Sequence, residues 1–597
     1  MKPKTTGIWF VLAASLFAFI WLYQTWLRPA APVVVPLLPD FHANSVTGLS
    51  VSPAGAREIS VVRTNGGWQL QSPLAYPAQA AAIDALAGAL EKLVPATRLT
   101  ADKIRAHKNA DAEFGFDNPQ FRVFVKAGDQ QRQLLVGNLT APGDQVYIRV
   151  VGVDGAFVTD AAWLPLLPHS ANDWRDTSLI DGAGACNWIV ITNGTRAMEF
   201  RKNATNQLWR MIRPLQARAD GARLAAAFQQ LRAGRVTKFI TDDPRADLSS
   251  YGLQPADLSV WLGHGTNMDA GVETGKSTPD NAALVFARRA GWNAVVTANK
   301  DAFTGWRGTL NDYRDPHLIT LSSPPAEIEV QGSHPFTLRQ RASNDWAVVG
   351  EKFPGDTENV QQLLKLLTSL RVSEFVKDVP TAASYEDYGL TNSSRAITLL
   401  GTAGDTNSVL AQLLFGASET NRVFVKRADE DFVYAITPAD FTNLFLFDAG
   451  WFYRDRHIWN FSETNVAQVT LRQSGKTRVL VRTGENKWSL GAGSQGIINP
   501  PALEEAIHRL GQLTVYNWIG RNIVDPEKNY GLNPDNLSIT VELKTGEKLG
   551  VDFGAELPKS QTALAAVTLD GERWAFIFPP VLYQFVTQYL TIPPNAP

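Results

Sequence analysis

Apolar residues follow two patterns along the chain. The first is an uncharged stretch from Gly7 to Leu27, about 21 residues, which is long enough for one helix across a bilayer. After it, short segments that alternate apolar and polar residues, typical of half-buried strands, recur together with stretches whose apolar residues return at helical spacing, such as 360–370. The pattern therefore predicts one N-terminal transmembrane helix and, beyond it, antiparallel strands with amphipathic helices.

The charges around the apolar stretch predict its orientation. Lys2 and Lys4 precede it and only Arg28 follows closely, so the positive-inside rule keeps the N-terminus in the cytoplasm. A cleaved signal peptide is the alternative, but bulky residues at the end of the stretch leave no small-x-small site directly after it. We therefore expect an uncleaved single-pass anchor in the inner (cytoplasmic) membrane, with the bulk of the chain in the periplasm and the membrane contacted through residues 7–27.

A turn-like signature of an aromatic residue, a glycine and an apolar residue occurs four times in the remaining chain. Its glycines lie 137, 137 and 142 residues apart, and a tryptophan precedes each glycine by 43 to 47 residues. The residues of this repeat motif are Trp68, Gly115, Trp209, Gly252, Trp346, Gly389, Trp488 and Gly531. Such regular spacing predicts four tandem copies of a unit of about 140 residues.

Each copy follows the same order of predicted elements. A hairpin of short strands comes first, then one main amphipathic helix, the glycine turn, further antiparallel strands and a short aromatic-rich helix. One helix that faces several antiparallel strands predicts an α+β unit. The expected boundaries are 1–6 for the cytoplasmic N-terminus, 7–27 for the transmembrane helix, 28–45 for a Pro-rich linker, and 46–178, 179–317, 318–457 and 458–597 for repeats one to four.

A second motif lies where one copy ends and the next begins. It consists of an aromatic residue followed by arginine and aspartate, at Trp174, Arg175, Asp176, Tyr313, Arg314, Asp315, Tyr453, Arg454 and Asp455. The fourth copy lacks it and ends in Ile592-Pro593-Pro594. We interpret it as a junction, in which the ring packs between units while Arg and Asp pair or cap the incoming strand. The alternative is a repeated ligand contact, since arginine can bind a carboxylate through two hydrogen bonds.

These residues resemble a known family. Leu49-Ser50-Val51, Gly67-Trp68-x-Leu70-x-x-Pro73 and the Tyr-Gly-Leu-x-x-Pro turn are similar to the bacterial domain-of-unknown-function family 4340, over most of the chain after Pro39. The first copy departs from the pattern with Phe-Gly-Phe, and the third lacks the proline. The resemblance implies a membrane span followed by repeated extracytoplasmic units. It also implies association with ABC-type transport systems of the gliding-motility kind, and no assigned catalytic residue.

Composition narrows the function classes. Of the 597 residues, 45% are hydrophobic and 19% charged, with a net charge of −2, so the chain is globular and offers no basic surface for nucleic acid. Its single cysteine, Cys186, excludes an internal disulfide and a cysteine zinc site. The eight histidines show no metal-binding spacing, so we predict no catalytic, metal-binding or cofactor-binding residue.

Two segments match nucleotide motifs. Ala270 to Ser277 (AGVETGKS) fits a permissive P-loop pattern, but the repeat alignment places its Gly275 at a strand edge and a strand follows. Gly491 to Gly496 (GAGSQG) fits the dinucleotide fingerprint, but no βαβ series surrounds it. We therefore expect no nucleotide to bind.

The sequence thus predicts a non-enzymatic, membrane-anchored periplasmic protein that works through membrane-protein partners of the ABC-transporter type. It would be an auxiliary or scaffold component of their complex, and edge strands could bind a partner by strand addition. The alternative is a glycan or cell-wall binding module, because tryptophan rings stack on sugars. We interpret the tryptophans of the repeat motif as core residues instead.

Overall fold

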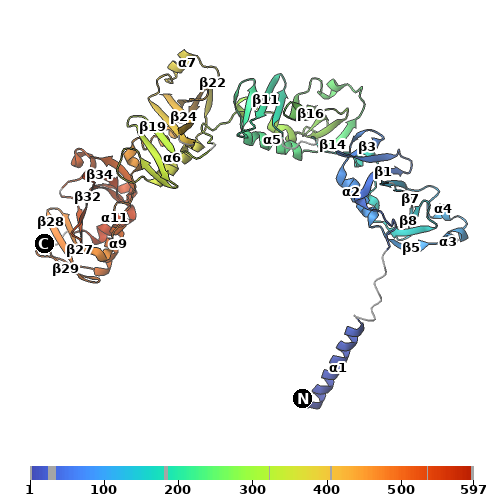
Figure 1. Cartoon of the computed structure of the whole chain (residues 1–597), viewed down its shortest axis with the longest axis horizontal. Helices are drawn as coiled ribbons and strands as arrows, with labels where there is room; N and C mark the ends of the chain where they lie inside the picture. Colours follow the sequence, from blue (N-terminus) through green and yellow to red (C-terminus); the bar gives the residue numbers. More distant parts are fainter. Residues whose placement is uncertain are drawn as a thin grey trace. The chain divides into compact units, whose positions relative to one another are not determined.

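The computed structural model describes residues 3–23, 35–128, 130–180, 186–321, 323–403, 406–533 and 535–592. These residues divide into two compact units, Met1–Tyr313 and Arg314–Pro597. Each unit contains two antiparallel sheets, so the chain carries four sheets in sequence order (Figure 1).

The N-terminal helix differs from the prediction. Helix α1 spans Pro3–Leu22, and no helix in the described ranges is long and apolar enough to cross a membrane. The described helix covers only the first part of the predicted span, about 24 Å from Gly7 to Leu22 at 1.5 Å per residue, against a hydrocarbon core of roughly 30 Å. The predicted transmembrane helix over 7–27 and the single-pass inner-membrane localisation are therefore wrong. Residues 24–34, which include most of the apolar part of the predicted linker, lie outside the described residues.

The fold class also needs correction. We predict an N-terminal transmembrane helix followed by four α+β repeats of antiparallel strands with one main helix each. Strands dominate the described chain, which forms four antiparallel sheets of eight or nine strands, and the membrane helix of that prediction is not supported. The repetition that the spacing predicts is nevertheless visible in these sheets, because all four follow one strand order apart from a short edge strand that only the first two sheets have among the described residues.

The first sheet has the order β4-β3-β2-β1-β6-β7-β8-β9-β5. Its strands are β1 (Val46–Pro53), β2 (Ile59–Thr64), β3 (Gly67–Ser72), β4 (Tyr76–Pro77), β5 (Pro95–Leu99), β6 (Phe121–Ala127), β7 (Gln130–Leu139), β8 (Gln145–Val150) and β9 (Ala156–Asp160). The helices are α2 (Ala80–Glu91), α3 (Ala101–Ala106) and α4 (Ala110–Glu113), with 3-10 turns η2 (Ala43–Ser45), η3 (Leu164–Leu166) and η4 (Ala171–Asp173).

The second sheet repeats this order as β13-β12-β11-β10-β15-β16-β17-β18-β14. Its strands are β10 (Trp188–Asn193), β11 (Arg196–Lys202), β12 (Trp209–Arg213), β13 (Ala217–Arg218), β14 (Val236–Thr241), β15 (Leu258–His264), β16 (Asn267–Ser277), β17 (Leu284–Arg289) and β18 (Val295–Asn299). The helical segments are α5 (Gly221–Ala233), η5 (Leu248–Tyr251), η6 (Lys300–Trp306) and η7 (Asn311–Tyr313). The buried apolar residues of both sheets form one continuous core in this unit.

The third sheet, in the second unit, has the order β21-β20-β19-β23-β24-β25-β26-β22. Its strands are β19 (Glu327–Gln331), β20 (Phe336–Ala342), β21 (Asp345–Val348), β22 (Glu374–Lys377), β23 (Arg395–Ala403), β24 (Thr406–Ser418), β25 (Val423–Arg427) and β26 (Val433–Ile436). The helices are α6 (Thr357–Ser369), α7 (Ala382–Asp387) and α8 (Pro438–Leu444), and η8 is Gly450–Tyr453.

The fourth sheet has the order β29-β28-β27-β31-β32-β33-β34-β30. Its strands are β27 (Val466–Gln473), β28 (Lys476–Gly484), β29 (Lys487–Leu490), β30 (Asn517–Arg521), β31 (Ser538–Leu543), β32 (Lys548–Leu557), β33 (Thr562–Leu569) and β34 (Glu572–Ile577). The helices are α9 (Pro500–Gly511), α10 (Pro526–Tyr530) and α11 (Pro580–Tyr589), with η9 (Glu463–Asn465) and η10 (Pro558–Ser560).

One main helix in each repeat, α2, α5, α6 or α9, packs its apolar stripe into the core. In α6, for example, Val360, Leu363 and Leu367 are buried. The side chain of Asn499 accepts a hydrogen bond from the Ala502 amide and so caps the start of α9. The chain after each main helix returns along the far edge of the sheet, as β5, β14, β22 or β30.

Candidate functional site

The glycine turns of the repeat motif share one conformation. Gly115, Gly252, Gly389 and Gly531 have φ between 68° and 78°, a left-handed region that side chains disfavour. A Cβ atom at any of them would also lie 2.7 to 2.9 Å from a backbone nitrogen of the neighbouring strand. Glycine is therefore required at these positions for two independent reasons.

A second glycine in each repeat lies on the neighbouring strand, directly against the turn, and we call it the receiving glycine. Gly137, Gly275, Gly416 and Gly554 lie in β7, β16, β24 and β32, and a Cβ atom there would collide with the carbonyl oxygen of the aromatic residue before the turn glycine. The glycine pair thus lets the turn lie directly on the sheet. This contact explains the P-loop-like sequence, because Ala270 to Ser277 lies within strand β16 and Gly275 is the receiving glycine.

The tryptophans of the repeat motif lie mainly in the core. Trp68, Trp346 and Trp488 are buried, and Trp209 is half-buried. In the first and fourth repeats the indole Nε1 donates to a carboxylate of the main helix, at 2.9 Å from Asp84 and from Glu504. These rings hold the hairpin against the main helix.

The first junction motif binds its arginine in an aromatic cage. Arg175 is 1% exposed, and its Cζ lies 3.6 Å from the ring centroid of Phe239 on β14 and 4.2 Å from that of Tyr76 on β4. Its two terminal nitrogens bind the carboxylate of Asp242 at 3.0 and 2.6 Å. Because Tyr76 and Phe239 belong to different sheets of the same unit, this guanidinium joins two repeats.

The later motifs use the same chemistry in the second unit. Arg314 pairs with Asp378 at 2.5 Å and lies 4.1 Å from the ring centroid of Phe375 on β22. Arg454 pairs with Asp570 at 3.0 Å and lies over the rings of Trp574 and Phe353.

The aromatic residues of the motif are buried, and Tyr313 and Tyr453 each contact a ring of the repeat that they end. Trp174 and Tyr313 lie in the core of the first unit, and Tyr453 contacts Phe336 of the third repeat at 5.3 Å between ring centroids. The aromatic residue thus closes one repeat, while the arginine that follows it binds the next edge strand.

The aspartates of the junction motif cap the chain that follows them. Asp176, Asp315 and Asp455 each accept a hydrogen bond from the backbone N–H two residues later, at 3.0 Å. In two motifs that residue is a histidine, His317 or His457, whose ring Nδ1 also lies 2.9 to 3.0 Å from the aspartate. These histidines therefore have a local partner at the junction.

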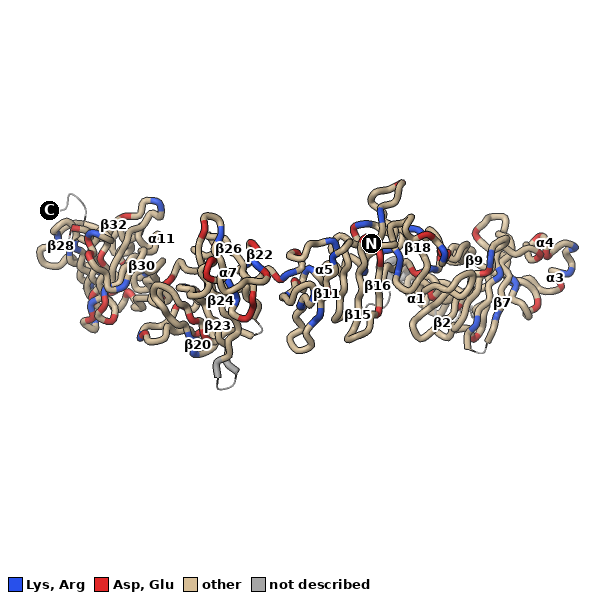
Figure 2. The backbone as a smooth tube through the Cα atoms, turned by 90° about the horizontal axis from the view of Figure 1, so that it is seen from above, with Lys and Arg blue, Asp and Glu red and all other residues tan. Residues whose placement is uncertain are grey.

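The remaining chemistry-bearing residues do not converge. Among the described residues, no group of three or more His, Cys, Asp or Glu side chains is placed to hold a metal ion. Burial raises the pKa of the Cys186 thiol, which lowers its reactivity at neutral pH. Gly491 to Gly496 lie before α9, which begins only at Pro500. Basic and acidic residues are interspersed along both units (Figure 2).

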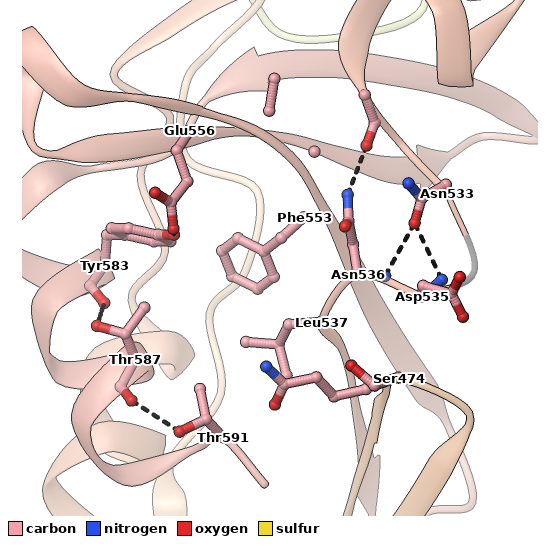
Figure 3. A pocket seen from close by; sticks show the side chains of 14 residues that line it. Ser474, Asn533, Asp535, Asn536, Leu537, Phe553, Glu556, Tyr583, Thr587 and Thr591 are labelled. Carbon is pink, nitrogen blue, oxygen red and sulfur yellow. Dashed lines mark hydrogen bonds between the residues drawn. The ribbon is translucent and has the colours of Figure 1, made fainter. Parts of the chain in front are cut away.

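A cavity of about 560 Å³ lies beside the glycine turn of the fourth repeat (Figure 3). Its walls come from the turn before β31, the end of β32 and helix α11. They carry Phe553, Tyr583, Glu556 and Asp535 together with amide and hydroxyl side chains. The Tyr583 hydroxyl donates to Glu556 Oε1 at 3.1 Å, and burial together with this carboxylate raises the pKa of Tyr583 to about 12.

Sequence reasoning did not find this cavity. Gly531 beside the cavity belongs to the predicted repeat motif, but the other walls come from β32 and α11, which lie 20 to 60 residues further along the chain. A comparison of the four copies position by position would have carried a signal, because small residues stand in the fourth copy where the third has larger ones.

Comparison with known proteins gives one family. A family model described as "Domain of unknown function (DUF4340)" matches residues 68–202, 209–336 and 346–562, which is more than half of the chain. The three segments begin at Trp68, Trp209 and Trp346, and the third segment continues into the fourth repeat. No curated protein matches the chain significantly.

Proposed function

The chain belongs to the DUF4340 family, and we propose that it is a non-enzymatic protein-binding scaffold, an auxiliary component of an ABC-type transport complex of the gliding-motility kind. The transport context rests on what the family resemblance implies. The scaffold role rests on the repeats themselves.

The observation that carries the scaffold role is the use of the recurring charged motif. Arg175 and Arg454 each bind a carboxylate and aromatic rings at the border of two sheets, which stabilises one repeat against the next. Arginines placed this way are not available to a substrate, because Arg175 is 1% exposed and Arg454 8%. The arginines of the junction motif thus hold neighbouring repeats together. Repeat proteins that offer an extended surface to partners are built in the same way, from contacts between adjacent repeats.

The burial of the repeat tryptophans disfavours a glycan-binding module. Stacking on a sugar needs an exposed indole face, whereas Trp68, Trp346 and Trp488 are at most 9% exposed. Exposed apolar side chains such as Val379, Ile497 and Val524, which are 72% to 93% exposed, are instead suited to protein contacts.

Crosslinking in cells followed by affinity capture of the full-length chain tests the proposal. We expect subunits of an ABC-type transporter among the captured proteins, identified by mass spectrometry. An unrelated protein with the same tag, captured under the same conditions, is the control. Recovery of the chain alone would contradict the proposal. Saturable binding of glycan that quenches tryptophan fluorescence would favour the alternative.

A further inference from the structure

We propose that the cavity of the fourth repeat binds an arginine side chain of a protein partner. The inference rests on the proposed protein-binding function and names the chemistry of one contact. The inference comes from comparing one place in the second, third and fourth repeats. We call this place the corner: it lies beside the glycine turn, next to the residue that precedes the receiving glycine.

In the third repeat a guanidinium of the chain itself occupies this corner. Phe415 precedes the receiving glycine Gly416, and Arg395 is its partner across β23 and β24. The Arg395 Cζ lies 4.9 Å from the ring centroid of Phe445 and 5.4 Å from that of Phe441 at helix α8. Phe415 itself contacts both rings.

The second repeat fills the corner with another arginine. Thr274 precedes the receiving glycine Gly275, and Arg307, directly after η6, binds the Thr274 hydroxyl at 3.2 Å. The same guanidinium pairs with Asp257 at 2.6 Å. The two repeats thus supply the arginine from different elements, yet both place a guanidinium in this corner.

The fourth repeat keeps the walls and lacks the arginine. Phe553 precedes the receiving glycine Gly554, and Leu537 stands at the position of Arg395, six residues after the turn glycine. Tyr583 contacts Phe553 at 5.9 Å, as Phe441 contacts Phe415 at 5.7 Å. One helical turn later the fourth repeat has Thr587, where the third has Phe445. These smaller side chains line the cavity of about 560 Å³.

The chemistry of the walls selects a cation. Two carboxylates, Glu556 and Asp535, line the cavity, and none of the described lining residues is basic. The rings of Phe553 and Tyr583 add faces on which a guanidinium can stack. Glu556 accepts the Tyr583 hydroxyl through Oε1, so a planar cation with several donors fits beside it. A phosphate or carboxylate ligand would meet only like charges here.

The size of the cavity favours an arginine on a polypeptide. Binding sites for small ligands span about 300 to 1,000 Å³, so this cavity holds an arginine side chain together with flanking backbone. Thr591 and Asn533 lie on opposite sides of the cavity (Figure 3), and Gln473 also lines it, so hydroxyl and amide groups are available to bind peptide groups. The occupant is therefore an arginine-bearing segment of a partner rather than a free metal cation.

Binding of N-acetyl-arginine amide to the purified full-length chain tests the site, by saturation-transfer NMR and calorimetry. We expect saturable binding, at least about fivefold tighter than that of N-acetyl-citrulline amide, which has the same shape without the charge. Leu537→Arg should abolish binding, because it restores the arginine of the third repeat. Glu556→Gln should weaken binding about threefold.

The matched control is Val151→Arg, which adds the same charge at a position in the first repeat that is 50% exposed and does not line the cavity; it should bind as the wild type does. If Leu537→Arg fails to fold, Thr587→Phe fills the cavity as Phe445 does and should also abolish binding. Absence of binding to the wild type, equal binding of the citrulline probe, or undiminished binding to both filled variants would overturn the inference. If transporter subunits are still captured in that case, the proposed function stands without this site.

Discussion

At the scale of single residues, the glycine pairs of the four repeats are tightly constrained positions. The turn glycine needs a positive φ and the receiving glycine needs open space above its Cα, and the two meet in every repeat. The first requirement follows from local turn geometry, whereas the second arises only because the turn lies on the sheet. The loss of stability on substitution should therefore be larger where a glycine turn lies on the sheet than where a glycine only has a positive φ.

Gly531→Ala should destabilise the second unit by about 3 kcal/mol, because it adds backbone strain and a contact of 2.8 Å with the Ala555 nitrogen. Gly546→Ala is the matched control. Gly546 has φ 87° but nothing within 4 Å of its Cβ position, so only strain of about 1 kcal/mol remains. Chemical denaturation gives both values. Equal losses would show that the contact on the sheet contributes nothing.

Because Tyr453 is buried, we expect the stability of the folded chain to fall at alkaline pH. Burial raises its pKa above the ordinary value of 10, so the folded chain keeps the phenol neutral where the unfolded chain ionises it. Stability from this group is complete below about pH 10 and falls as the pH rises further. Tyr453→Phe should therefore make the loss of stability above pH 10 shallower, as measured by urea unfolding at several pH values. Tyr516→Phe, at a 56% exposed position, should leave the profile unchanged. Identical profiles for Tyr453→Phe and wild type would contradict the assignment.

At the scale of elements, the decisive contact joins the end of one repeat to the edge strand of the next. The aromatic residue of the junction motif packs into the repeat that it ends, and the following arginine binds an aromatic ring on β14, β22 or β30. In the fourth repeat Arg521 stands where the second and third have Asp242 and Asp378, and the acidic partner Asp570 comes from the β33–β34 turn instead. The arginine is thus kept while its counter-ion moves between elements.

Arg175→Ala should destabilise the first unit by about 3 kcal/mol, because it empties a buried cage and leaves Asp242 without its cation. Hydrogen exchange of the β14 amides should accelerate with it, since Phe239 loses the guanidinium that covers its ring. Arg105→Ala provides the comparison. Arg105 pairs with Asp102 on the surface, and we expect no measurable change there. Normal protection of β14 in Arg175→Ala would argue against a joint between repeats.

At the scale of the whole molecule, the chain consists of two compact units whose border falls inside a junction motif, between Tyr313 and Arg314. Tyr313 lies in the core of the first unit, and Arg314 pairs with Asp378 of the second. The first unit therefore closes its core from two sheets up to the last residue before this border.

Calorimetry should accordingly resolve two unfolding transitions. Arg175→Ala should lower the transition temperature of one, and Gly531→Ala that of the other, because the substitutions lie in different units. Each variant serves as the control for the other. A common shift of both transitions in either variant would mean that the two units unfold as one.

Much of the repeat architecture was predictable from the sequence. The spacing of Gly115, Gly252, Gly389 and Gly531 reveals four copies, and helical periodicity locates α6 and α9, since turn conformation and amphipathic faces are properties of neighbouring residues. The same local reasoning failed at the N-terminus. The uncharged run from Gly7 to Leu27 shows only that these residues are apolar. It does not fix the length of the helix, and α1 ends at Leu22.

The sequence by itself determined the number of repeats, the glycines of their turns and the positions of the junction arginines. Only the tertiary structure decided which side chains these arginines bind and that the corner of the fourth repeat is a cavity. The cage of Arg175 joins rings 163 residues apart, and the cavity of the fourth repeat depends on Leu537, Phe553 and Thr587 meeting from three elements. The physical reason is that such sites combine side chains far apart in the sequence, and only the packing of sheets and helices in the folded unit brings these side chains together.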